Sequence, residues 1–208
     1  MHSEWRCDRC GPVLPLHVPL HVNADVLAAA VAEVSRPHRS ESGPVPLWCP
    51  WPLPKGWTVT GVGWAGDERA GVRGTVLACS GPSPLTGGPA DLLLVAEAPG
   101  VGLAARYAGQ TGADPGPPLA AAMASGPPHA KPRAGRHPTS MWSIPSPQDR
   151  SAYVGEALAV WLVAIAWPPA AGYLLADDLV LLDLTDWLPP EVVYGAPSAR
   201  LHQDARNG

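Results

Sequence analysis

The sequence contains no phenylalanine, and isoleucine, lysine and asparagine occur only twice each among its 208 residues. Charged side chains make up 15% of the chain, and the basic ones are spread along it instead of clustering. Together with a formal net charge of −4, this distribution disfavours a nucleic-acid binder that depends on neutralising phosphates. The hydrophobic fraction of 46% excludes a wholly disordered chain, so we expect at least one buried core.

Targeting and membrane signals are also lacking. The stretch from Met1 to Cys7 has no apolar run of the kind found in secretory signals. The longest apolar segment, residues 152–167, would span about 24 Å as a helix, which is short of a bilayer's hydrocarbon core. We therefore expect a cytoplasmic protein that does not enter membranes. Its four cysteines are too few for a disulfide scaffold and should be reduced.

Glycine and proline are abundant, at 22 and 27 residues, and this excludes a long helical bundle. The length predicts one body with a small appendage. Residues 1–46 form a ribbon-like head, with a short helix at 24–34 and a linker; residues 47–198 form the body; residues 199–208 form a tail. Within the body, residues 109–145 have no sustained period, and we expect an irregular excursion there.

Three β-branched or apolar segments, at 58–65, 73–80 and 92–96, predict an antiparallel meander. A short helix near 100–107 and a strand at 179–184 follow. Ser146 to Asp149 resembles a capping box with proline at the first helical position, and Pro168-Pro169 would end the helix, so the pattern predicts a helix over about 147–167. The predicted fold class is α+β: a mostly antiparallel sheet packed on this central apolar helix, whose buried Glu156 would pair with Arg106 or Arg150.

Four residues near the N-terminus form a candidate zinc site: Cys7, Cys10, His17 and His21. The two-residue spacing of the cysteines and the three-residue spacing of the histidines are both typical of zinc ligands. Only six residues separate the pairs, against about twelve in a zinc finger. Cys49 or His38 could therefore supply a ligand instead, or the head could be a ribbon without metal. A closed four-ligand site would be structural and not catalytic.

Asp67, Glu97 and Arg106 are the candidate binding residues, because Glu97 ends an apolar strand and Arg106 follows on a glycine-rich turn that could hold an anion. An ion pair or helix cap would equally explain Glu97 and Arg106, and Asp67 suits a turn.

Cys79 could be a nucleophile or a small buried side chain. Three further residues could grip a ligand or a proline-rich peptide, or simply pack, since nine of the thirteen aromatic residues are tryptophan: Trp48, Trp51 and Trp57.

Several sequence blocks over roughly residues 48–185 carry a resemblance to a known family. They are Trp51-Pro52-Leu53-Pro54, Gly56-Trp57, Thr60-Gly61-Val62, Ala65-Gly66-Asp67, Ala78-Cys79-Ser80-Gly81-Pro82, Leu94-Val95-Ala96-Glu97, Gly100-Val101-Gly102-Leu103, Ala105-Arg106-Tyr107-Ala108-Gly109 and Gly155-Glu156-Ala157-Leu158. The chain resembles an uncharacterised family of small proteins from high-GC actinobacteria. The resemblance implies a zinc-ribbon-like N-terminal element of two cysteine knuckles. Its first knuckle matches at Cys7 to Gly11, and the second is not recognisable.

The sequence shows no nucleophile–base pair, phosphate loop or open metal site, and no catalytic residue is assigned. We therefore expect a non-enzymatic cytoplasmic binding or regulatory protein, acting on a protein partner, with zinc as the one candidate cofactor. The alternative is a small transferase or hydrolase that uses Glu97, Arg106 and acidic turn residues on an anionic substrate. A water-accessible cleft lined by these residues would favour the enzyme, whereas their dispersal would favour the binding protein.

Overall fold

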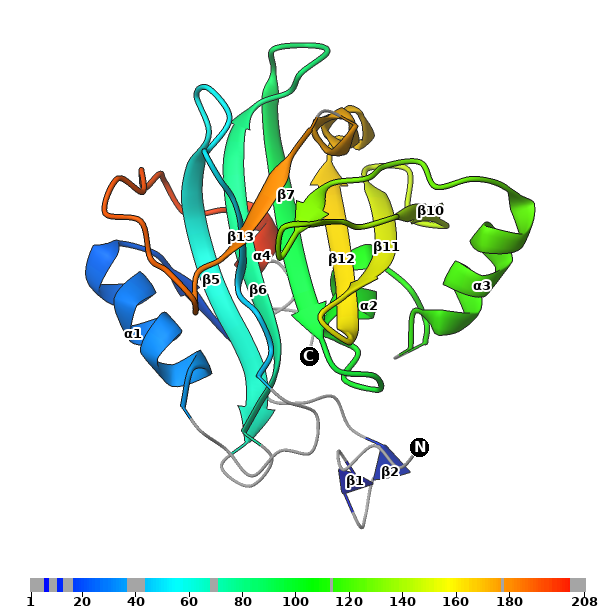
Figure 1. Cartoon of the computed structure of the whole chain (residues 1–208), viewed down its shortest axis with the longest axis horizontal. Helices are drawn as coiled ribbons and strands as arrows, with labels where there is room; N and C mark the ends of the chain where they lie inside the picture. The colour runs from blue at the N-terminus through cyan, green and yellow to red at the C-terminus, as the bar shows by residue number, and fades with distance from the viewer. Residues whose placement is uncertain are drawn as a thin grey trace.

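The computed structural model describes residues 6–7, 11–12, 17–36, 44–67, 71–112, 114–176 and 178–202. Its centre is a seven-stranded antiparallel sheet with the order β10-β11-β12-β7-β6-β5-β3 (Figure 1). The strands are β3 (His17–His21), β5 (Thr58–Asp67), β6 (Gly71–Pro82), β7 (Pro89–Glu97), β10 (Trp142–Ile144), β11 (Ser151–Ala157) and β12 (Val160–Trp167). The α+β class with a mostly antiparallel sheet is confirmed.

A smaller sheet of four strands, in the order β4-β13-β8-β9, lies across one face of the large sheet (Figure 1). Its strands are β4 (Trp48–Pro50), β8 (Arg133–Ala134), β9 (His137–Pro138) and β13 (Val180–Asp183). The two sheets enclose a core that includes Trp48, Leu77, Leu92 and Leu162, each at most 1% exposed. A separate two-stranded pair, β1 (Arg6–Cys7) and β2 (Gly11–Pro12), precedes both sheets.

Helices cover the remaining surfaces of the large sheet. They are α1 (Ala24–Val34), α2 (Leu103–Ala108), α3 (Gly116–Ser125), α4 (Ala199–His202) and the 3₁₀ helix η1 (Pro169–Leu175). The first helix packs on β5 and β6, whereas α2 packs on the face opposite the small sheet, in a second core with Val95 and Ile165. The sheet is thus buried on both faces, which explains why β7 and β12 are almost continuously apolar. None of the described helices combines the length and apolarity needed to cross a membrane.

The predicted central helix over 147–167 is wrong, because the segment forms the hairpin of β11 and β12. Side chains of β12 alternate between the two cores, with Leu162 on one side and Val163 on the other. An apolar pattern all round therefore reflects a strand buried on both faces. Leu158 and Ala159 form the turn, with φ of 53° and 61°. The expected cap at Ser146 is absent, since its hydroxyl donates to the Arg150 carbonyl at 3.1 Å.

Other expectations had mixed outcomes. The helix at 24–34 is confirmed, and the Asn23 side chain caps it by accepting the Val26 N–H at 2.8 Å. The meander and the short helix after it are confirmed as β5, β6, β7 and α2.

The excursion at 109–145 is more ordered than expected, because Pro117 and Pro118 occupy the first turn of α3, where proline is tolerated. Glu156 is exposed on β11 opposite Trp161, so its predicted burial is wrong. The tail from 203 onward lies outside the described residues.

Candidate functional site

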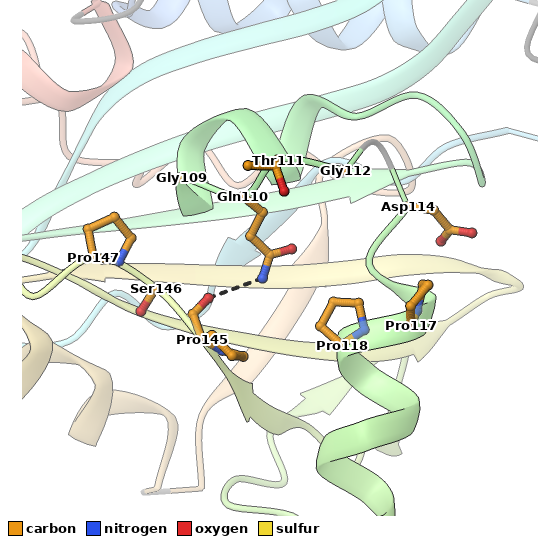
Figure 2. Close-up of a pocket in the computed structure, with 10 residues that line it drawn as sticks. All are labelled: Gly109, Gln110, Thr111, Gly112, Asp114, Pro117, Pro118, Pro145, Ser146 and Pro147. Carbon is orange, nitrogen blue, oxygen red and sulfur yellow. Dashed lines mark hydrogen bonds between the residues drawn. The ribbon is translucent and has the colours of Figure 1, made fainter.

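A pocket of about 540 Å³ opens between the end of α2, the start of α3 and the connection from β10 to β11 (Figure 2). This volume falls within the range of small-molecule sites in proteins. The lining residues are Gly109, Gln110, Thr111, Gly112, Asp114, Pro117, Pro118, Pro145, Ser146 and Pro147. Four of them are prolines, whose fixed φ angles give the walls little freedom to change shape.

Gln110 joins two walls of this pocket. The α2 helix ends at Gly109, whose φ of 71° lies in the left-handed region, and the chain then turns away from the helix axis. The Gln110 backbone N–H donates to the Ala105 carbonyl at 2.9 Å, and its side-chain Nε2 donates to the Pro145 carbonyl at 3.1 Å. Figure 2 shows the side chain extending toward Pro145, with its amide oxygen pointing away from Pro145.

Further hydrogen bonds hold the wall at the start of α3 and the wall formed by the connection from β10 to β11. Asp114 Oδ1 accepts the Gly116 N–H at 2.9 Å, which orients the carboxylate at the start of α3. On the opposite side, Ser146 is tied to Arg150, whose Nη1 donates to the Tyr107 carbonyl of α2 at 2.7 Å. These bonds connect the loop from β10 to β11 with the helix that forms the first wall.

Glu97 positions the beginning of α2, at the other end of the helix from the pocket. Its Oε2 accepts the backbone N–H groups of Leu103 and Ala104 at 2.7 and 3.1 Å. The side chain is fully buried, and its Oε1 has no hydrogen-bond partner among the described residues. Burial raises the pKa of this carboxyl from 4.5 to about 8, against the lowering effect of the two N–H donors. The cap interpretation of Glu97 is confirmed.

The three predicted binding residues do not line the pocket. Arg106 lies half-buried on α2, and Glu97 lies beneath that helix. Asp67 pairs with Gly71 at the tip of the hairpin of β5 and β6, and its side chain lies outside what the structure describes. A binding role for Asp67, Glu97 and Arg106 stays a prediction.

The structure places the two histidines of the proposed zinc site on β3. His17 contacts Tyr107, whose hydroxyl lies 3.1 Å from Nε2, and His21 Nδ1 lies 3.4 Å from the Thr60 carbonyl oxygen. Four residue steps along an extended strand separate their Cα atoms by about 13 Å, and the side chains stand roughly perpendicular to the sheet. In this conformation the two imidazoles do not converge on one ion.

The cysteine half of that site cannot be assessed in the same way. The side chain of Cys7 and the whole of Cys10 lie outside the described residues. Among the residues that are described, no three histidine, cysteine, aspartate or glutamate side chains are grouped closely enough to hold a metal ion. Zinc binding by Cys7 and Cys10 stays a prediction.

The tryptophans divide between packing and exposure. Trp48 and Trp57 are buried, and Trp57 Nε1 donates to the Pro82 carbonyl at 3.1 Å, so both are core residues. Trp51 is partly buried and meets the half-exposed Trp187 edge to face, with ring centroids 6.3 Å apart. Trp51 is thus the one member of the predicted group that contributes to the surface.

Cys79 is fully buried beside Cys49, which is also buried. A hydrogen bond with the Cys49 thiol, together with burial, raises the pKa of the Cys79 thiol well above its usual value. Because the thiolate is the nucleophile, this environment is that of an inert packing residue.

We expect both thiols to be unreactive in the folded protein. In a Cys7→Ser/Cys10→Ser variant, labelling by Ellman's reagent should be roughly a hundredfold slower in buffer than in denaturing urea. Absorbance at the wavelength of the released thiolate measures both rates. Rapid labelling of one thiol in the folded variant would restore the nucleophile interpretation of Cys79.

The sequence profile of a family of unknown function, DUF6758, matches residues 1–201. The chain belongs to DUF6758. No curated protein and no solved structure matches it. Membership in DUF6758 confirms the resemblance to an uncharacterised family and assigns no activity.

Sequence reasoning missed the pocket residues of this DUF6758 chain, Gln110 and Asp114 above all. One local signal could have found half of the pocket. Prolines at 115, 117 and 118, followed by an alanine-rich run, are typical of a helix start, and Asp114 immediately precedes them. Next to Pro145, in the other wall, the pattern of Ser146 to Asp149 indicated a helix start and not a pocket.

Proposed function

We propose that the protein is a non-enzymatic cytoplasmic binding protein, and that the pocket between α2 and α3 receives a small ligand or a side chain of a partner protein. The pocket's lining is the observation that carries this proposal. Its functional groups are two hydroxyls, one amide and one carboxylate, and among the described lining residues there is no histidine, cysteine, lysine or arginine. Such a lining can orient a ligand but offers no activated nucleophile.

The placement of Glu97 also supports binding over the transferase or hydrolase. A general acid or base must come within hydrogen-bond distance of the reacting group. Glu97 is fully buried, and two backbone N–H groups of α2 occupy its Oε2. Its observed contacts are those of a residue that holds the helix in place, which in turn places Gly109 and Gln110 at the pocket.

A pocket-filling substitution tests this proposal. Gly112 lines the pocket and a Cβ added there meets no atom within 4 Å, so Gly112→Trp should add a bulky indole at the pocket without disturbing the fold. Gly126 has equally open surroundings and does not line the pocket, which makes Gly126→Trp the matched control. Equal unfolding temperatures would establish that both variants are folded.

Each of the three proteins is then mixed with an extract of the source cells, and the small molecules that it retains are identified and compared by mass spectrometry. We expect the amount of compound retained by Gly112→Trp to be lower by about tenfold or more than the amount retained by the wild-type protein and by Gly126→Trp. Equal retention by all three proteins, or retention by none, would contradict a binding role for this pocket.

A further inference from the structure

The charge at the pocket is negative. Asp114 is the one charged side chain among the ten described lining residues. Its Oδ1 is held by the Gly116 N–H, so the carboxylate has a defined orientation at the pocket's edge. The nearest basic residue along the chain from Ser146, Arg150, does not line the pocket: its Nε lies 2.8 Å from Asp149 Oδ1, its Nη1 donates to the Tyr107 carbonyl, and its guanidinium lies 4.9 Å from the centre of the Trp167 ring.

The polar groups of the pocket favour hydrogen-bond donors on a ligand. One Nε2 hydrogen of Gln110 donates to the Pro145 carbonyl, and the amide oxygen, an acceptor, points away from Pro145 (Figure 2). The Ser146 hydroxyl donates a hydrogen bond to the Arg150 carbonyl, so its oxygen is left to accept one from a ligand.

We infer that the pocket selects organic cations that carry N–H donors on an apolar stem, namely alkylammonium or alkylguanidinium groups, and discriminates against anions. This inference rests on the proposed function. Asp114 pairs with the charge, the Gln110 oxygen accepts one N–H, and the proline rings at 117, 118 and 145 contact the stem. The same chemistry is found in a free amine and in an arginine or lysine side chain of a partner protein.

Amide NMR titration of the full-length protein tests the inference with three probes of similar size: n-butylguanidinium, 1-butanol and butyrate. We expect butylguanidinium to shift the amide signals of Gly109, Gln110 and Gly112, with a dissociation constant about fivefold below that of butanol. Butyrate should bind more weakly than butanol. Asp114→Asn keeps the acceptor for Gly116 and should remove the advantage of the cation, whereas Asp178→Asn, exposed outside the pocket, should retain it.

The outcomes separate the inference from the proposed function. If butanol or butyrate binds these amides more tightly than the cation does, the charge assignment is overturned and the pocket remains a binding site. If no probe shifts them at about 50 mM, where contacts of so few atoms should be detectable, both are overturned.

An acetylated Ala-Arg-Ala amide and its citrulline counterpart distinguish the source of the cation. Tighter binding of the arginine peptide, dependent on Asp114, would support an arginine side chain of a partner protein as the ligand. Binding of butylguanidinium alone would support a free small molecule.

Discussion

We expect the free energy of unfolding to fall as the pH rises from about 4.5 to about 8, because of Glu97. Below this window the carboxyl is protonated in both the folded and the unfolded chain. Within it the unfolded chain loses the proton, whereas the folded protein keeps it until the pH reaches the raised pKa of about 8. Folding then binds a proton, so stability decreases by about 1.4 kcal/mol per pH unit and levels off above the window.

Glu97→Gln isolates this contribution from that of other titrating groups. The amide oxygen can still accept the N–H groups of Leu103 and Ala104, but the side chain stays neutral at every pH. Urea unfolding at several pH values between 5 and 9 should give a flatter profile for Glu97→Gln than for the wild type. Glu156→Gln, on an exposed position of β11, should keep the wild-type profile. Parallel profiles for the wild type and Glu97→Gln would show that Glu97 is not a buried cap.

Gly155→Val should destabilise the protein by about 3 kcal/mol, although valine is favoured in strands. A Cβ at Gly155 would press on the carbonyl oxygen of Ser140 and lie 3.2 Å from Met141 Cγ. The segment it would displace leads into β10 and hence to Pro145, so ligand binding in the pocket should weaken as well.

The midpoint of urea unfolding measures this loss. Gly126→Val serves as the control, since its surroundings are open, and should change stability by less than about 0.5 kcal/mol. A Gly155→Val protein as stable as the wild type would contradict the close packing of Ser140 on β11.

The parts of the fold that were predictable from sequence are those with local signals. Asn23 before an amphipathic run marks the start of α1, and the glycine-flanked turn between residues 66 and 71 marks the hairpin of β5 and β6. The hairpin of β11 and β12 lacks such a signal, because Leu158-Ala159 contains neither glycine nor asparagine. Its pairing with β7, a long-range contact, decides the conformation.

The candidate site shows the same division. Glu97 at the end of an apolar strand, followed by a glycine-rich turn, was recognisable as a cap because the cap is local. The pocket was not recognisable, since its walls meet through the hydrogen bond from Gln110 to Pro145, which joins residues 35 positions apart. Three of the prolines that suggested an irregular segment between 109 and 145 line the pocket: Pro117, Pro118 and Pro145.

The most direct test of the account is to map where ligands from the source cells bind. Amide NMR spectra of the labelled protein are recorded with and without the compounds that the wild type retains from the extract. The signals of Gly109 to Gly112 and of Ser146 should change. Signals of the exposed surface around Trp51 and Trp187 should stay in place. Changes centred on Trp51 and Trp187, with the pocket amides unmoved, would contradict the proposal and assign binding to that surface instead.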